Sequence, residues 1–500
     1  MSAPLLPVRR LAAAAVLLLA GCAVGPDFAR PAPPTADGFT RTPAPQTTET
    51  ADIKGGAAQH LVAGRDLPGE WWSLFRSPQI TDLVARAIRA NPDLAAAEAT
   101  LRVARENTRA GQGALFPSIS GGFSHTRQQV SLAAFGLGNG SALFSLDSAS
   151  LNVSYTLDVF GGIRRQVEQL DAQAEYERFE LEATYLTLAA NVVNAAISEA
   201  ATQAQIDATR EILRLYRQEL DVSQRRFELG GISRADVLQQ QSSLAAAEAT
   251  LPPLIKQLEQ TRNQLAVYLG AQPAQFTDAP VTFASLNLPE ELPLSLPSKL
   301  VEQRPDIRAY EALLHSATAG VGIATANMLP NVSLTAGYGY EGTTLPLLFT
   351  PTGLVWSLAQ AIAQPVFEGG TLLHRRRAAM ATVQVAAAQY SSTVNTAFKD
   401  VANALVSLDQ DAQALHAQLL SERTAAESLE VARAQFSAGA GSYLSLLAAE
   451  QTFQNARLLL VAAQAIRFSD TVALFQALGG GWWNRHDVNA DIVDCCGILP

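Results

Sequence analysis

The sequence repeats itself once, at a fixed offset of 213 residues. Asn91-Pro92-Asp93-Leu94 returns as Arg304-Pro305-Asp306-Ile307, and in each copy a second proline, Pro117 or Pro330, follows the first by 25 residues. Self-similarity at a fixed offset indicates a duplicated structural unit. The chain is therefore expected to contain two equivalent copies that obey the same local rules.

The hydrophobic pattern changes its period at both second prolines. Helical spacing over about 77–113 gives way after Pro117 to apolar-polar alternation, which is clear over 151–159. The second copy repeats this order, with a helix over 298–328, a strand from Asn331, a loop over 341–352 and a strand over 354–367. Glycine-rich residues 132–148 are predicted to form the loop of the first copy. Because proline cannot extend a helix but is tolerated where a strand begins, Pro117 and Pro330 are predicted helix-to-strand junctions.

Each strand pair is followed by a very long helical segment. Residues 163–229 contain no proline and would form a helix roughly 100 Å long at 1.5 Å per residue. Gly230 and Gly231 break it, and a shorter helix returns over about 233–269. The second copy has a long helix to Phe436, a break that includes Gly439 and Gly441, and a helix to Leu478. Two helical hairpins with glycine tips are expected.

The four strands predict a membrane sheet. Segments of about ten residues with one apolar and one polar face match transmembrane β-strands. Four strands are too few to close a barrel, and open edges are not tolerated in lipid, so several chains must share one. The fold class is therefore mixed: long helical hairpins joined to a transmembrane β-barrel. A soluble sheet packed on helices is the alternative, although these helices are far longer than such a sheet requires.

The N-terminus has the features of a secretion signal. Arg9 and Arg10 precede an apolar run over 11–20 that is too short to span a bilayer. It ends in a sequence that resembles a bacterial lipobox, formed by Leu19, Ala20, Gly21 and Cys22. The resemblance implies cleavage before Cys22, lipid attachment to its sulfur and, because Ala23 follows, sorting to the outer membrane. Alternatively, Cys22 is an ordinary residue at the end of a signal peptide.

The predicted domain boundaries follow from these elements. In chain order they are a signal peptide (1–21), a proline-rich extended tether (22–70), the first repeat (71–270), a linker (271–297), the second repeat (298–479) and a tail (480–500). Adjacent Cys495 and Cys496 in the tail cannot staple a fold together, and no role is assigned to them. Arg164 and Arg165 follow Gly161-Gly162, and Arg375-Arg376-Arg377 follow Gly369-Gly370, where strands are predicted to end. These arginines are expected to face solvent or lipid headgroups.

Several function classes are disfavoured. The chain carries 36 basic and 46 acidic side chains, a net charge of −10, without a basic block suited to nucleic acid. Residues 337–342 fit G-x-G-x-x-G, yet no helix follows to receive a pyrophosphate. Six scattered histidines lack ligand spacing. Neither an enzyme, a cofactor nor a bound metal is expected.

Motifs along nearly the whole chain resemble one family. They are Cys22 with Gly25-Pro26-Asp27-Phe28, Trp71-Trp72 with Phe75 and Pro78, the two proline motifs at 91–94 and 304–307, Leu296-Pro297-Ser298, and Pro365-Val366-Phe367 with Gly369-Gly370. Each is weak alone, but their order and spacing are specific. The chain resembles the TolC-like outer membrane factors of tripartite efflux pumps, in particular the NodT-type lipoprotein branch.

The resemblance implies a homotrimer with twelve strands in an outer-membrane pore and a helical barrel in the periplasm. A periplasmic adaptor (membrane fusion protein) and an inner-membrane transporter of the resistance-nodulation-division (RND) type would be the partners, and the chain would be a passive duct for small molecules. Heavy-metal efflux and type I protein secretion are alternatives within this class. A structural coiled-coil envelope lipoprotein is the alternative of another class.

The resemblance also implies a closure at the periplasmic helix tips, near Gly230, Gly231, Gly439 and Gly441. The family closes this end with helix tips and with carboxylates in a segment of the form L-x-x-L-D-A, which here spans residues 444–449. Ala448 replaces the aspartate, and Ser445 lies upstream of it. The first copy keeps Asp236. The constriction is therefore predicted to be apolar, from Leu444 and Leu447, unless these side chains and Asp236 merely pack or solvate the hairpins.

Overall fold

The computed structural model describes residues 23–34, 38–43, 45–131, 133, 136 and 138–485. The predicted signal peptide, Cys22, Cys495 and Cys496 lie outside the described residues. Contacts divide the chain into two compact units. The first comprises the described parts of Met1–Pro31 with Thr100–Arg178 and Ala309–Tyr390, and the second comprises those of Ala32–Ala99, Phe179–Arg308 and Ser391–Pro500. Each unit contains segments from both sequence copies.

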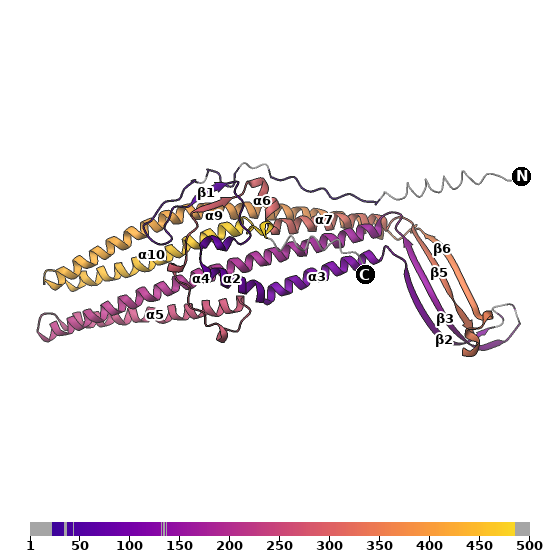
Figure 1. The fold of residues 1–500 in the computed structure, drawn as a ribbon, viewed down its shortest axis with the longest axis horizontal. Coiled ribbons are helices and arrows are strands. Elements are labelled where there is room, and N and C mark those ends of the chain that lie inside the picture. The colour runs from indigo at the N-terminus through magenta and orange to yellow at the C-terminus, as the bar shows by residue number, and fades with distance from the viewer. Residues whose placement is uncertain are drawn as a thin grey trace. The chain divides into compact units, whose positions relative to one another are not determined.

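The first unit contains a four-stranded antiparallel sheet in the order β2-β3-β5-β6 (Figure 1). Its strands are β2 (Ser118–Ser131), β3 (Ser141–Leu157), β5 (Asn331–Gly342) and β6 (Leu354–Ala363). Each sequence copy supplies one antiparallel pair, and β3 pairs with β5 where the copies meet. Between β5 and β6 lie a short helix, α8 (Leu345–Leu348), and a 3-10 turn, η5 (Pro351–Gly353).

In the rows that cross β2 between Ser118 and Phe123, the register gives the sheet one apolar and one polar face. Ile119, Val153, Ala336 and Leu358 form one row across the four strands, and the next row is Ser120, Asn152, Gly337 and Ser357. On the apolar face Ile119 is 72% exposed and Trp356 74% exposed. An apolar face this open to solvent is typical of a surface that contacts lipid or another chain.

Two predicted strand limits are wrong. The loop predicted at 132–148 is shorter, because β3 already begins at Ser141 and pairs with β2 from Ser131 onward. The glycine- and serine-rich sequence hides this pairing, which depends on backbone hydrogen bonds rather than on side-chain alternation. The strand predicted to reach Phe367 ends at Ala363. Pro365 follows two residues later and has no N–H to donate to a neighbouring strand.

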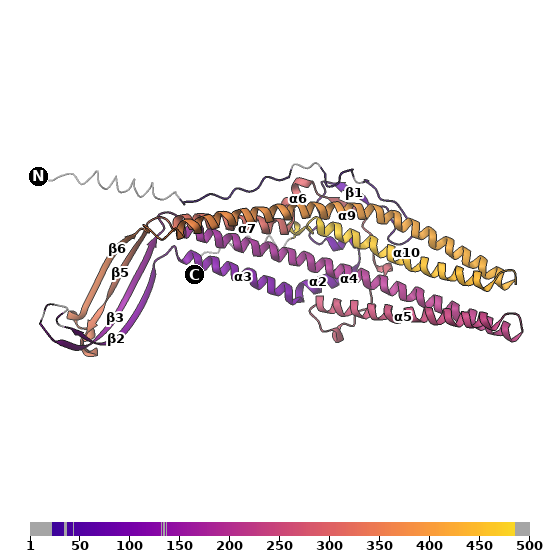
Figure 2. The same cartoon turned by 180° about the vertical axis from the view of Figure 1, so that it is seen from behind.

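The second unit is built around two helical hairpins. One pairs the tip half of α4 (Gly162–Glu228) with α5 (Arg234–Tyr268), and the other pairs that of α9 (Thr371–Ser437) with α10 (Tyr443–Ala477) (Figures 1 and 2). Apolar side chains fill each hairpin, for example Ile212, Leu213, Tyr216 and Ala247 in the first. By length and composition α10 could cross a membrane, but 56% of its apolar 18-residue stretch is buried by packing.

Both predicted upstream helices are broken at the repeated proline motif. Residues 77–113 form α2 (Pro78–Ala90) and α3 (Pro92–Gly113), and the second copy forms α6 (Pro297–Gln303) and α7 (Pro305–Ala326). Proline disfavours helical geometry in the residue before it, and Asn91 is accordingly extended. The Asn91 carboxamide accepts the N–H of Asp93 at 2.9 Å and donates to the Tyr268 carbonyl at 3.0 Å. In the second motif Arg304 donates to the Ala477 carbonyl at 3.1 Å. Each motif thus fixes the C-terminal end of the shorter helix of a hairpin.

The predicted tether and linker are more structured than expected. β1 (His60–Ala63) pairs in parallel with β4 (Glu291–Leu294), so the two segments form one small sheet. Leu67 and Trp71 are 1% exposed. The proline-rich composition concealed this order because buried side chains there are few and widely spaced. The linker also contains two short 3-10 turns, η3 (Pro273–Gln275) and η4 (Phe283–Ser285). Two more, η1 (Trp71–Phe75) and η6 (Trp482–Asn484), lie outside the tether and the linker.

Candidate functional site: helix tips and strand junctions

The first hairpin tip is a glycine turn followed by a capped helix. Gly230 has a left-handed backbone with φ of +75°, and Gly231 donates its N–H to the Arg226 carbonyl at 2.8 Å. Asp236 closes a capping box, because one of its carboxylate oxygens accepts the Ser233 N–H at 2.9 Å and the Ser233 hydroxyl at 2.8 Å. The carboxylate that the first copy retains therefore caps α5.

The second tip has the same design without the carboxylate. Gly439 has φ of +76°, and Gly441 donates its N–H to the Gln435 carbonyl at 3.1 Å. The Ser442 hydroxyl caps α10 by accepting the N–H of Ser445 at 3.1 Å. Ser445 thus occupies the position that Asp236 has in the first copy, three residues after the capping serine.

The predicted constriction residues lie in different environments. Leu444 is 72% exposed, whereas Leu447 is 5% exposed and packs inside its hairpin. The i, i+3, i+4 spacing of Tyr443, Leu446 and Leu447 places these three on the buried stripe of α10. Ala448 is exposed on the same side as Leu444. Of the two predicted leucines, Leu444 is therefore the one available to line an opening.

An arginine that the sequence did not single out joins the two tips. Arg226 of α4 donates to the carbonyls of Phe436 and Ser437 at 3.1 and 3.0 Å, at the end of α9. Its guanidinium also lies 4.7 Å from the centroid of the Phe436 ring. The last turns of α4 and α9 are thus joined by two charge-assisted hydrogen bonds.

A second, buried group of polar side chains joins the hairpins next to the tips. The Tyr443 hydroxyl donates to the Gln240 carboxamide oxygen, which links α10 to α5. Arg433 of α9 forms an ion pair with Glu219 of α4 at 2.9 Å. Glu450 of α10 is 2% exposed beside them, and burial followed by the effect of Glu219 raises its pKa to about 9. A charged residue within an apolar helical stripe is the signal that could have identified Glu450 from the sequence.

The strand junctions lie in the first unit. Pro117 directly precedes β2, four residues after α3 ends, and Pro330 directly precedes β5, four residues after α7 ends. The turns between are the same, since Phe116 donates its N–H to Gly113 and Leu329 donates to Ala326, at 3.1 and 2.9 Å. Both sequence copies therefore change from helix to strand in the same way.

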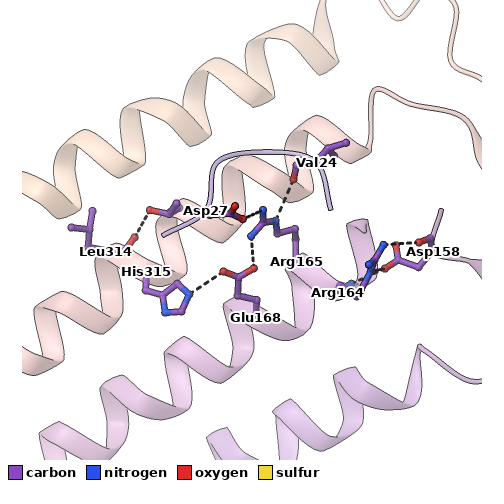
Figure 3. A network of polar contacts seen from close by, with 9 residues as sticks. Val24, Asp27, Asp158, Arg164, Arg165, Glu168, Leu314 and His315 are labelled. Atoms are coloured by element: carbon purple, nitrogen blue, oxygen red, sulfur yellow. Dashed lines mark hydrogen bonds and ion pairs between the residues drawn. The ribbon is translucent and has the colours of Figure 1, made fainter. Parts of the chain in front are cut away.

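The N-terminal segment is held against this unit by a polar network (Figure 3). Arg165 of α4 donates to Asp27 at 2.6 Å, to Glu168 at 2.7 Å and to the Val24 carbonyl at 3.2 Å. Glu168 contacts the ring of His315 at 2.9 Å. The expectation of a solvated or headgroup-facing arginine pair is wrong for Arg165, whose side chain is 5% exposed.

The chain at residue 23 reaches the turn between β3 and α4. Val24 donates its N–H to the Phe160 carbonyl at 3.0 Å. A Cβ atom on Gly161 would lie 2.5 Å from the Cα of Ala23, so glycine is required there. Phe28 stacks on His315 with ring centroids 4.5 Å apart. These contacts fix the residue that follows Cys22 beside a strand-to-helix turn.

Four predicted site residues cannot be placed, because Leu19, Ala20, Gly21 and Cys22 lie outside the described residues. Within the described ranges, no group of three or more His, Cys, Asp or Glu side chains is arranged to hold a metal ion.

Comparison with known proteins gives consistent matches over almost the whole chain. A sequence profile of the outer membrane efflux protein family matches residues 83–271 and 296–480. The toluene efflux pump outer membrane protein TtgC of Pseudomonas putida is 30% identical over 475 residues, which cover 95% of each chain. The cation efflux system protein CusC of Escherichia coli is 28% identical over 483 residues, covering 95% of this chain and 99% of CusC. The solved outer-membrane channel OprN superposes with a TM-score of 0.81 at 27% identity, covering 92% of this chain and all of OprN.

Proposed function

Because this chain belongs to the outer membrane efflux protein family and is the outer-membrane channel component of an efflux system, we propose that it works as a homotrimeric exit duct for small organic compounds. The family is one of channels rather than of enzymes. The observation that carries the proposal is a sheet with an exposed apolar face and two open edges.

The open edges of the sheet support the trimer. β2 and β6 are the outermost of four strands, and all ten residues of β6 are exposed. Within lipid such edges must be paired, and the smallest transmembrane barrels have eight strands. Three chains with four strands each give twelve. Native mass spectrometry of the detergent-solubilised protein should therefore give the mass of three chains, and a monomer would contradict the proposal.

The polar face of the sheet supports a cargo of small organic molecules. If the apolar face contacts lipid, the lumen is lined by hydroxyl, amide and small side chains such as Ser118, Ser154, Thr335 and Ala359. Among the described residues, the three polar-face rows from Ser118 to Gly122 carry no charged side chain, and Glu341 lies in the row beyond them. The uncharged rows suit uncharged or amphipathic compounds better than ions. Export of cations, which the name of CusC gives for that protein, is the second candidate.

Drug and metal susceptibility of a deletion strain tests the cargo. We expect the minimal inhibitory concentrations of apolar antibiotics and the tolerance of toluene to fall severalfold, and the tolerance of metal salts to stay unchanged. The intact gene should restore both organic phenotypes. A strain sensitised only to metal cations would replace the organic cargo with the cation alternative.

We further propose an adaptor of the membrane fusion type and an RND-type inner-membrane transporter as partners. The two tips present exposed apolar side chains, Leu229 at 87% and Leu444 at 72% exposure, which suit docking to another protein. Photo-crosslinkers introduced at these positions should capture the adaptor in cells. Adducts formed equally well at the exposed Leu143 in β3 would contradict docking at the tips.

Lipid attachment at Cys22 is proposed as the anchor to the outer membrane. Support comes from Ala23 and Val24, which contact the turn where β3 ends and α4 begins. This turn joins a strand of the proposed membrane sheet to a helix, and an N-terminus held there suits a lipid anchor in the inner leaflet.

Replacing Cys22 by Ser is expected to remove radiolabelled palmitate from the protein. The N-terminal peptide should lose its acyl mass, and the share of protein in the outer-membrane fraction should fall. Cys495→Ser is the matched control and should leave palmitate incorporation unchanged. Undiminished labelling of the Cys22→Ser variant would exclude this anchor.

We propose that the closure at the tips is apolar and that Leu444 contributes to it, with the glycine turns setting the position of the tips. Exposure of Leu444 beside Ala448 supports this assignment.

A further inference from the structure

Two carboxyl groups meet between the hairpins without enough positive charge to balance them. Glu450 on α10 is 2% exposed, and the Glu219 side chain on α4 is 19% exposed. Within the described part of the chain, both carboxyl oxygens of Glu450 and Oε2 of Glu219 are buried without a hydrogen-bond donor. Buried ionised carboxylates without donors are strongly disfavoured, so the arrangement calls for an additional proton.

The groups around this pair come from all four tip helices. Arg433 of α9 contacts the other Glu219 oxygen, Oε1, at 2.9 Å. Tyr216 of α4 and Tyr443 of α10 are the neighbouring hydroxyls, and burial followed by the charge of Glu450 raises the pKa of each. From α5, the carboxylate of Asp236 acts on Tyr443. One arginine therefore faces two close acids, and neutrality is reached when one of them is protonated.

We propose that Glu450 is protonated and donates its O–H to Oε2 of Glu219, and that this shared proton is a pH-sensitive latch between the two hairpins. The proton satisfies the oxygens that lack donors, while Glu219 keeps its ion pair with Arg433. Loss of the proton leaves two carboxylates in contact, which favours separation of α10 from α4. The inference rests on the proposed duct function only in that separated hairpins would open the tip end of the channel.

The direction of the pH dependence follows from the raised pKa. In the packed hairpins burial holds the pKa of Glu450 at about 9, above its usual 4.5. Once the hairpins separate, water would return it toward 4.5. The packed arrangement thus has its full advantage below 4.5 and loses it as pH rises toward 9. Between these limits the ratio of separated to packed hairpins should rise by up to about tenfold per pH unit.

Pulsed electron paramagnetic resonance on the full-length protein in liposomes tests the latch. Nitroxide labels are attached to Leu229→Cys and Ala438→Cys, one exposed position at each tip, with Cys495→Ser and Cys496→Ser removing the other reactive thiols. We expect the fraction of long label separations to increase from pH 5 to pH 9. Glu450→Gln, which is neutral at every pH, should abolish the increase. Glu430→Gln removes an exposed acid that also pairs with Arg433, at 3.5 Å, and should keep the increase.

The proposal is overturned if label separation does not change between pH 5 and pH 9, or if Glu450→Gln responds like the parent. Should Glu450→Gln fail to assemble, Glu450→Met serves, because an unbranched side chain of similar length likewise carries no titratable proton and should also abolish the increase. Planar-bilayer conductance of the same samples separates this test from the duct function. A pH-dependent separation without conductance supports the latch and contradicts the duct, whereas conductance without pH-dependent separation does the reverse.

Discussion

Gly270→Ala is expected to destabilise the folded chain by more than about 3 kcal/mol. Gly270 ends α5 with φ of +65°, and its N–H and that of Ala271 donate to Val267 and Ala266 at 3.0 and 2.9 Å. This is the Schellman arrangement, which favours glycine. A Cβ atom at this position would lie 2.1 Å from the Ala90 carbonyl oxygen, so the variant combines backbone strain with a clash against main chain.

Gly230→Ala is the matched control for this prediction. Gly230 has a similar φ of +75°, but a Cβ atom added there would have no neighbouring atom within 4 Å. Only the backbone strain applies there, about 1 kcal/mol. Guanidinium unfolding of the detergent-solubilised protein, followed by circular dichroism, measures both variants. Equal losses for the two glycines would show that the contact with Ala90 is not restrictive.

Arg226→Ala is expected to raise the open probability of the channel roughly thirtyfold, because it removes the hydrogen bonds that join the tips of α4 and α9. Two charge-assisted hydrogen bonds between partly exposed groups contribute about 2 kcal/mol together, which corresponds to that factor. Arg226 donates both of them to α9 main-chain carbonyls. Single-channel recording in planar bilayers measures the effect, and antibiotic uptake by intact cells should rise in parallel.

Arg225→Ala removes the same charge from the neighbouring position and is the control. Arg225 is exposed and pairs with Asp221 on its own helix at 2.8 Å, so the link between tips remains. Its conductance should match the parent. If both variants conduct alike, the contact of Arg226 with Phe436 does not restrain the tips.

Leu444→Ser tests the apolar closure in the same recordings. Leu444 is exposed, so its loss should raise conductance without affecting hairpin stability. Leu447→Ala is less informative, because removing a buried leucine creates a cavity that costs about 2–5 kcal/mol and loosens the hairpin itself. Unchanged conductance in Leu444→Ser would place the constriction elsewhere.

The fold class predicted from the sequence is confirmed by the family profile and by the solved channel structures. The prediction succeeded because its signals are local. Proline before β2 and β5, glycine at the hairpin turns and the change of hydrophobic period all act on neighbouring backbone. They recur in both copies, so each copy supports the elements predicted for the other. The assignment to an efflux duct is confirmed on the same findings.

The roles of individual residues at the candidate site were harder to predict from the sequence than the fold. The sequence predicts Asp236 and Ser445 as residues of a closure, and in the structure both also belong to helix caps. Leu444 and Leu447 were equivalent in the sequence, but rotation of α10 about its axis buries one and exposes the other. A residue's direction around a long helix depends on what packs against it, and residue spacing gives only relative directions.

The sequence by itself determined the duplication, the helix-to-strand junctions at Pro117 and Pro330 and the two glycine tips, because proline and glycine restrict the backbone wherever they occur. Only the tertiary structure decided which side chains meet between the hairpins. Arg226 reaches the end of α9, and Glu450 meets Glu219 across residues far apart in the chain. Such contacts depend on the rotation and register of whole helices, which are set by packing over their full length.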